Sequence, residues 1–258
     1  MKKIFLVFLF FTSASFNIFA GTKDTTLSGD LNRDNILDRV KVSFTTNEDG
    51  IYSYLDGNFT VNINGAEYKD RCEQADVFDV KIVEIEPNDI SPSVLVSCYG
   101  YGDQGEYFFY QFKNNKVVPL GSIKAWGSAE IKGDGKILVS DWMGFWSLQA
   151  EYFLNKSTNK LELNRQDTYE VNVEGTVQQS FKLLKSRDDN SEVVQTLKPG
   201  TKVTLLKCDT KPVCAKNADG YEDEYDCDWY LMKTAGGTEG WVRMKDFREN
   251  INDLPWAG

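Results

Sequence analysis

The chain of 258 residues contains no histidine. Cysteine peptidases that use a Cys–His pair and amidases that bind zinc through histidine are therefore excluded. Long apolar runs are also missing after the N-terminal segment, and none approaches the roughly 20 residues that a membrane-spanning helix needs. The sequence thus predicts a mature chain with no transmembrane segment and no histidine-dependent catalysis.

Basic residues are in the minority, with 29 lysines and arginines against 39 aspartates and glutamates, and the net charge is −10. Such a surface repels polyanions, so we expect no nucleic-acid partner. It favours a basic protein as a partner instead. Hydrophobic residues make up 41% of the chain, which is enough to form a buried core.

The first 20 residues have the layout of a secretory signal peptide. Lys2 and Lys3 form a positively charged n-region, the apolar run 4–11 follows, and the small residue Ala20 ends the segment. We therefore predict removal of residues 1–20 and a secreted or periplasmic location; a retained N-terminal anchor is the alternative. Loss of the two lysines changes the net charge from −10 to −12, because the segment has no acidic residue.

Five cysteines in an exported chain make disulfides plausible. Their spacing favours a Cys72–Cys98 pair in the first half and a Cys208–Cys227 pair in the second, with Cys214 as the odd thiol. A zinc site built from the last three cysteines is a weaker alternative, because the chain has no CxxC spacing and no suitable fourth ligand nearby.

Alternating apolar residues indicate strands along most of the chain. Val40, Val42 and Phe44 alternate with polar residues, which is typical of a half-buried strand. Four turn signals predict hairpins between such strands, at Asn64-Gly65, Asn114-Asn115, Gly133-Asp134-Gly135 and Lys156–Asn159. No long helical pattern occurs, so we predict an all-β protein.

A polar segment over residues 166–178 suggests a boundary between two domains, because the spacing of the strands changes after it. We divide the mature chain at about residue 172. The first domain then covers residues 21–172 and the second covers residues 173–258.

The segment 29–40, GDLNRDNILDRV, has oxygen-bearing side chains at alternating positions before a strand. Calcium binds six to eight oxygens, and a tight loop of this kind can supply them. The candidate ligands are the side chains of Asp30, Asn32, Asp34 and Asp38 and the backbone carbonyl of Ile36. Asn35 lies at the position where the loop needs a left-handed backbone conformation, which asparagine tolerates. The alternative is a turn held by hydrogen bonds between side chains and backbone, without metal.

This loop and its strand resemble the DxNxDGxxD signature of FG-GAP/VCBS repeats. A weaker second copy begins at residues 84–89, with Ser93 in place of the final acid, and a third lies around residues 133–135. The resemblance implies an antiparallel β-domain, arranged as a partial propeller or a sandwich, with one structural calcium ion.

The segment 181–247 resembles a bacterial SH3 (SH3b) domain. Leu183 matches the first strand of that family, residues 193–200 match its turn, and residues 202–205 match the next strand. Trp229 and the run Gly240-Trp241-Val242 match the last two strands. The resemblance implies a small β-barrel that binds a cell-wall peptide or a protein partner.

An acidic insertion with two tyrosines is the candidate contact surface of this domain, since tyrosine supplies contact area and the acids attract a basic partner. The candidate partner-binding residues are Tyr221, Glu222, Asp223, Glu224, Tyr225, Trp229 and Trp241. The alternatives are a solvated loop tip for the insertion and a core position for the two tryptophans.

The expected function is non-enzymatic binding at the cell envelope. The acidic charge also fits a second hypothesis, an inhibitor or immunity protein that blocks a basic wall-degrading enzyme. A glycosidase needs only two carboxylates and is the third hypothesis. Its nearest candidate is an aromatic cluster with two acids, Trp142, Phe145, Trp146, Asp141 and Glu151.

Overall fold

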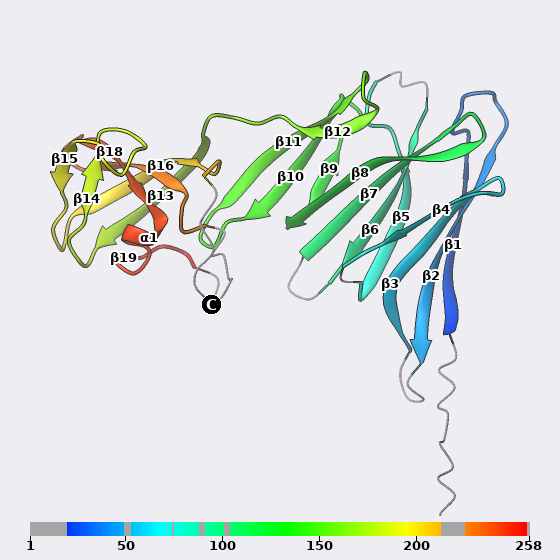
Figure 1. Ribbon diagram of the computed structural model, residues 1–258, viewed down its shortest axis with the longest axis horizontal. Coiled ribbons are helices and arrows are strands. Elements are labelled where there is room, and N and C mark those ends of the chain that lie inside the picture. Colours follow the sequence, from blue (N-terminus) through cyan, green and yellow to red (C-terminus); the bar gives the residue numbers. More distant parts are fainter. Residues whose placement is uncertain are drawn as a thin grey trace, which may run out of the picture.

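The computed structural model describes residues 20–48, 53–73, 75–87, 91–100, 104–212 and 225–256. The described chain is all-β and its strands pair antiparallel, as predicted (Figure 1). The helix α1 (Met244–Phe247) has four residues, and no helix in these ranges is long and apolar enough to cross a membrane. The predicted signal peptide, except its last residue, lies outside the described part of the chain.

Three four-stranded antiparallel sheets, each with its strands in sequence order, make up the first part of the protein. Meander 1 consists of β1 (Ala20–Gly29), β2 (Asp38–Glu48), β3 (Ser53–Ile63) and β4 (Ala66–Arg71). Meander 2 consists of β5 (Val77–Val83), β6 (Ser93–Tyr99), β7 (Gln104–Lys113) and β8 (Lys116–Trp126). Meander 3 consists of β9 (Ala129–Ile131), β10 (Lys136–Trp142), β11 (Ser147–Asn155) and β12 (Lys160–Leu163).

The four predicted hairpin turns are confirmed at the ends of these strands. Asn64 and Gly65 join β3 to β4 with φ angles of 51° and 91°. Asn114 and Asn115 join β7 to β8 with φ angles of 53° and 57°. Asparagine and glycine tolerate this left-handed conformation, which a two-residue hairpin requires at both central positions.

Meander 2 lies between the other two, and both faces of its inner strands β6 and β7 are buried. Phe108 packs in one apolar cluster with residues of meander 1, and the adjacent Phe109 packs in a second cluster with residues of meander 3. Successive side chains of a strand point to opposite faces, so a strand between two layers needs apolar residues at consecutive positions. The run of buried residues in β6 and β7 follows from this arrangement.

Meander 1 presents a polar face on its outer side. Val40 and Val42 of β2 are fully buried, whereas the intervening Lys41 is half-buried and pairs with Asp24 of β1 at 2.8 Å. The stack of sheets therefore ends on a polar surface at meander 1. Repeat arrays use such a polar outer face to close a stack against solvent.

The second part of the protein is one seven-stranded sheet in the order β15-β14-β18-β17-β16-β13-β19. Its strands are β13 (Tyr169–Val177), β14 (Lys182–Leu184), β15 (Val193–Thr196), β16 (Lys202–Asp209), β17 (Trp229–Thr234), β18 (Glu239–Arg243) and β19 (Ile251–Asn252). The predicted barrel is not closed, because the edge strands β15 and β19 do not pair with each other. β19 is two residues long and pairs with β13.

The change from meander 3 to the C-terminal sheet occurs between Leu163, where β12 ends, and Tyr169, where β13 begins. β13 spans residue 172 and pairs with β16, so residues on both sides of 172 belong to the C-terminal sheet. Part of the polar run 166–178 belongs to this strand, which pairs with β16 on one edge and, at Thr176 and Val177, with β19 on the other.

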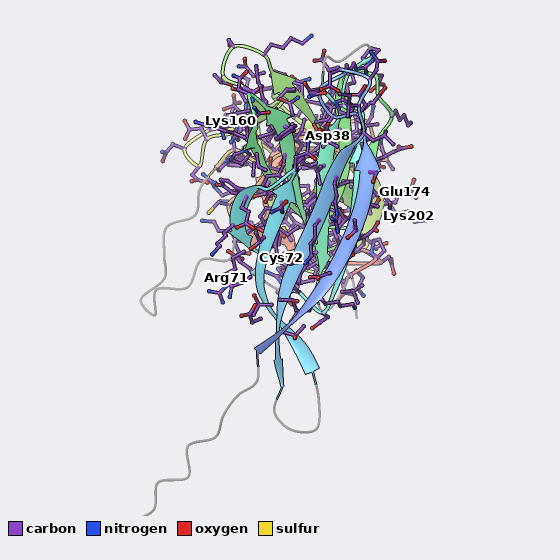
Figure 2. All side chains as sticks on the ribbon, turned by 90° about the vertical axis from the view of Figure 1, so that its right-hand side faces the viewer. Asp38, Arg71, Cys72, Lys160, Glu174 and Lys202 are labelled. Carbon is purple, nitrogen blue, oxygen red and sulfur yellow. A yellow bond between two sulfur atoms is a disulfide. The ribbon has the colours of Figure 1, made fainter. Side chains whose placement is uncertain are left out.

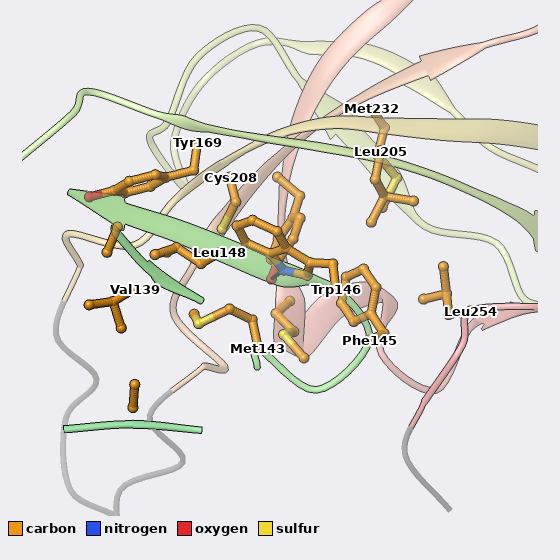
Figure 3. Packing of buried hydrophobic residues seen from close by; sticks show 14 of the residues in the cluster. Val139, Met143, Phe145, Trp146, Leu148, Tyr169, Leu205, Cys208, Met232 and Leu254 are labelled. Atoms are coloured by element: carbon orange, nitrogen blue, oxygen red, sulfur yellow. Dashed lines mark hydrogen bonds between the residues drawn. The ribbon is translucent and has the colours of Figure 1, made fainter. Parts of the chain in front are cut away.

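The loop between β10 and β11 joins the two parts of the protein. Its side chains Met143, Phe145 and Trp146 are 6%, 1% and 4% exposed and pack among residues of the C-terminal sheet (Figure 3). The indole Nε1 of Trp146 donates a hydrogen bond of 3.1 Å to the hydroxyl of Tyr230 on β17. The aromatic cluster considered for a glycosidase therefore supplies Phe145 and Trp146 to a shared hydrophobic core.

The predicted Cys72–Cys98 disulfide is confirmed and links the end of meander 1 to β6 of meander 2. The predicted Cys208–Cys227 pair is wrong. Cys208 is a free, fully buried thiol on β16, within 4.0 Å of the Asp228 carboxylate. Cys227 is disulfide-bonded, but not to Cys208; Cys214 lies outside the described residues. The register of β16 shifts between Leu205 and Lys207, and after this irregularity the side chain of Cys208 is buried in the core.

Candidate functional site

The loop between β1 and β2 contains the predicted calcium ligands. The two oxygens of the Asp30 carboxylate accept hydrogen bonds from the backbone N–H groups of Asp34 at 3.1 Å and Asn35 at 2.9 Å. The Asn32 side chain also accepts from the Asp34 N–H, and Asp34 accepts from the N–H of Ile36. Asn35 has the predicted left-handed conformation, with φ of 66°.

Asp38, the last predicted ligand, is 3% exposed. One of its oxygens accepts from the backbone N–H of Leu31 at 2.8 Å and the other from the Asn64 side chain at 2.6 Å. Within the described ranges, no three His, Cys, Asp or Glu residues are arranged to hold a metal ion. The loop therefore has the hydrogen bonds that a turn held by side chains and backbone requires, and the calcium site stays a prediction.

Substitution of Asp38 by alanine tests this assignment. We expect the free energy of unfolding to fall by about 2–3 kcal/mol, because the buried Leu31 N–H and the Asn64 amide each lose an acceptor. Urea unfolding with either calcium or a chelator measures the change, and calcium should not move the wild-type midpoint. Glu174→Ala, at an exposed position on β13 and away from this loop, is the control. A calcium-dependent midpoint that disappears in Asp38→Ala would support the calcium hypothesis.

The three calcium-like segments occupy equivalent positions, because each precedes the second strand of its meander. Arg33 of the first loop pairs with Glu84 of the second at 3.1 Å, and the Gly135 N–H of the third donates to the Ile85 carbonyl at 2.7 Å. The loops therefore lie side by side at one end of the stack. Figure 2 shows Asp38 at this end and Cys72 nearer the opposite end of meander 1.

The first loop also exposes two large apolar side chains. Ile36 is 68% exposed and Leu37 is 71% exposed. Ile36 was predicted to supply a backbone carbonyl to calcium. Its N–H donates a hydrogen bond of 2.8 Å to the Asp34 carboxylate, and the role of its carbonyl stays a prediction.

The predicted partner-binding residues Tyr221, Glu222, Asp223 and Glu224 lie outside the described residues. Tyr225 is half-buried and packs against the C-terminal core. Trp229 is 2% exposed, with the guanidinium of Arg243 over its ring at 4.3 Å.

Trp241 is half-buried under the guanidinium of Arg187, at 5.1 Å. The two tryptophans are therefore covered by arginines, and neither offers an open aromatic platform. Acidic side chains hold these arginines in place: Arg187 donates to Asp209 at 2.7 Å, and Arg243 donates to both oxygens of Asp189 at 2.8 and 3.0 Å. The hydrogen bond from Arg243 lowers the pKa of Asp189, so this carboxylate is charged and already neutralised by a cation.

An open groove with a volume of about 390 Å³ lies on the C-terminal sheet and includes Asp189, the partner of Arg243. Phe181, Leu184 and Val242 provide apolar surface, and Asp189 and Asp246 provide carboxylates. The full lining is Ser180, Phe181, Lys182, Leu184, Asp189, Val242, Asp246 and Asn250. We call this site the acidic groove. No motif in the sequence indicated it, because its walls come from β14, β18, α1 and the loop after β14.

Asp246 differs from Asp189 in its environment. No hydrogen bond or ion pair of the Asp246 carboxylate is found within the described ranges, whereas its backbone carbonyl accepts from the Asn250 side chain at 2.8 Å. Burial raises the pKa of Asp246 and the negative charge of Asp189 raises it further; Lys245 and Arg243 act in the opposite direction. Among the described residues, the Asp246 carboxylate therefore has cations in its surroundings but no direct ion pair.

A second groove of similar volume, about 390 Å³, crosses β13, β16 and β17. Its lining is polar and includes Glu174, Lys202 and Lys233, of which the first two are labelled in Figure 2. Two acids and two lysines line the second groove, whereas two acids and one lysine line the acidic groove beside Phe181, Leu184 and Val242. We therefore take the acidic groove as the candidate for peptide binding.

Comparison with known protein families, curated proteins and solved structures finds no match to this chain.

Proposed function

We propose that this chain is an exported, non-enzymatic binding protein whose C-terminal module holds a cell-wall peptide or a segment of a protein partner. The acidic groove is the observation that carries this proposal. Its apolar surface can bury aliphatic parts of an extended ligand, and its polar rim can accept hydrogen bonds from a peptide backbone.

Export is supported by the Cys72–Cys98 disulfide. Disulfides persist in oxidising compartments and are rare in the cytosol. Together with the signal-like segment at residues 1–20, this disulfide favours a secreted or periplasmic location.

We also propose that the two parts are related to the families that their sequences resemble. Three meanders that stack face to face are what a partial propeller of FG-GAP/VCBS-like units would produce. β14, β16, β17 and β18 occur where the SH3b-like motifs predict strands, and β15 lies at the start of the segment matched to the turn. A binding module attached to a rigid repeat array is compatible with the proposed role.

Filling the acidic groove tests the proposal. Ser180 is exposed and lines the groove, so Ser180→Trp should block it without disturbing the core. We expect this variant to lose on the order of 10-fold or more in affinity, because a bulky ring occupies the ligand's place. Sedimentation with purified peptidoglycan sacculi at several salt concentrations measures binding.

The matched control is Lys202→Trp, which adds the same ring to the second groove. If wild-type protein does not sediment with sacculi, a wall ligand is rejected. If Lys202→Trp loses binding and Ser180→Trp does not, the second groove is the site.

The acidic charge favours one further candidate function, inhibition of a basic wall-degrading enzyme. An inhibitor would stay in solution in the sedimentation experiment and would suppress a wall hydrolase in a lysis assay. Its effect should weaken as salt is added, because screening reduces the attraction between opposite charges.

A further inference from the structure

We propose that one end of meander 2 binds a saccharide, with the indole of Trp126 stacked on a sugar ring and neighbouring polar side chains bound to its hydroxyl groups. The site consists of Trp126, Gln104, Lys124, Glu106 and Glu73, and we call it the indole site. It goes beyond the proposed function, because it lies on a different sheet from the acidic groove and takes a different class of ligand.

Trp126, the last residue of β8, differs in exposure from the other tryptophans of the chain. It is 44% exposed, whereas the other five are buried or half-buried. Hydrogen bonds fix the backbone around it: its N–H donates to the Asp141 carboxylate at 2.7 Å, and the Gly127 carbonyl accepts from the Tyr107 hydroxyl at 2.7 Å. The indole is therefore exposed to solvent on a backbone that is held in place.

The register of β7 and β8 brings polar side chains next to this indole. Gln104 lies directly opposite Trp126, and Glu106 lies directly opposite Lys124. Residues opposite each other, and residues two apart on one strand, point to the same face of a sheet. All four side chains therefore share one face at the end of this pair of strands. The polar ones line a hollow of about 10 Å³, roughly the space of one water molecule or hydroxyl group.

Glu73 completes the polar part of the site, and the disulfide places it there. Cys72 precedes Glu73 in the chain, and its partner Cys98 lies opposite Glu106 on the neighbouring strand β6. The Glu73 N–H donates to the Glu106 carboxylate at 3.0 Å, and the Lys124 Nζ lies 2.5 Å from the Glu73 carboxylate. Glu106 is only 9% exposed, so its carboxylate is oriented before any ligand binds.

One exposed aromatic ring beside a compact set of polar groups suits a saccharide. One face of a pyranose ring consists of C–H groups, which pack on the electron-rich face of an indole. The hydroxyl groups at its edge both donate and accept, and the site offers an amide, two carboxylates and an ammonium group. A peptide with apolar side chains would need more apolar surface than one indole, and a polyanion would meet two glutamates against one lysine.

Titration of the full mature chain with soluble saccharides tests the inference. The probes are three tetrasaccharides, the β-1,4-linked tetramer of N-acetylglucosamine, cellotetraose and maltotetraose. They are added up to about 10 mM, because a shallow site that contacts one or two rings should bind on the order of 1 mM. Calorimetry measures affinity, and tryptophan emission reports on the indole. At least one probe should bind and change the emission; absence of binding by all three overturns the inference.

Substitutions within the site separate stacking from hydrogen bonding. Trp126→Ala should lower the affinity on the order of 10-fold or more, because the stacking surface is removed. Trp126→Phe should keep part of the affinity but abolish the change in emission. Gln104→Ala should lower the affinity about 3- to 10-fold, because one hydrogen bond to a hydroxyl group is lost.

Phe153→Ala is the matched control, because Phe153 is an aromatic residue on β11 of meander 3 that is 36% exposed. This variant should bind the saccharide as tightly as the wild-type protein. Unchanged affinity in Trp126→Ala, or an equal loss in Phe153→Ala, overturns the inference. Unchanged affinity in Gln104→Ala also overturns it, because the hollow would then take no part in binding. Circular dichroism verifies that the variants fold.

Discussion

Replacing Phe145 with alanine is expected to lower the free energy of unfolding by about 3–5 kcal/mol, the usual cost of removing a buried phenylalanine ring. Phe145 is 1% exposed, and its ring contacts Tyr230, Phe247 and Trp256 at centroid distances of 5.6, 6.4 and 4.8 Å. These partners belong to the C-terminal part, whereas Phe145 belongs to meander 3. The substitution therefore removes a side chain on which both parts depend.

Chemical denaturation followed by tryptophan fluorescence and circular dichroism measures this effect. Phe153→Ala is the matched control, because Phe153 is on β11 of the same meander but is 36% exposed. The control should cost far less, since surface substitutions usually change stability by within about 0.5 kcal/mol. If the two variants are equally stable, the loop does not join the two parts in the way that the contacts indicate.

The second large effect is expected on removal of the Cys72–Cys98 disulfide. Replacing both cysteines with serine should cost about 3–4 kcal/mol, because the bridge closes a loop over a sequence separation of 26 and restricts the unfolded chain. Both positions are fully buried, so the serine hydroxyl groups add to this cost.

Urea unfolding of the double variant without reductant measures this loss. Cys227→Ser is the comparison, because Cys227 is disulfide-bonded in the C-terminal part and its loss should leave the meanders intact. Alkylation of the unfolded, unreduced chain should label Cys208, the free thiol. Labelling of Cys72 or Cys98 in that experiment would contradict the assigned pair.

Local features of the sequence predicted most of the meanders. The alternation of Val40, Val42 and Phe44 and the Asn64-Gly65 turn depend on neighbours in the chain, and both are present in the structure as expected. The consecutive apolar residues Phe108 and Phe109 could not be assigned to a face, because the sequence does not tell how many layers cover a strand.

The candidate site was much harder to predict. Trp229 and Trp241 were candidate contacts, yet Arg243 and Arg187 cover them, and these pairs form across the fold. The acidic groove brings Phe181 and Leu184 next to Asp246, which lies about sixty residues later in the chain, so no local spacing signals it. The wrong Cys208–Cys227 pair has a similar origin: the strand on which Cys208 lies was expected, but the direction of its side chain was not.

The sequence by itself determined that the chain has no histidine, that it is acidic, and that strands of alternating apolar residues are joined by asparagine and glycine turns. These properties depend on composition and on contacts between near neighbours. Only the tertiary structure decided which faces are buried, which thiol is free and where a groove opens. Those properties depend on side chains that are distant in the chain and meet only when the sheets pack together.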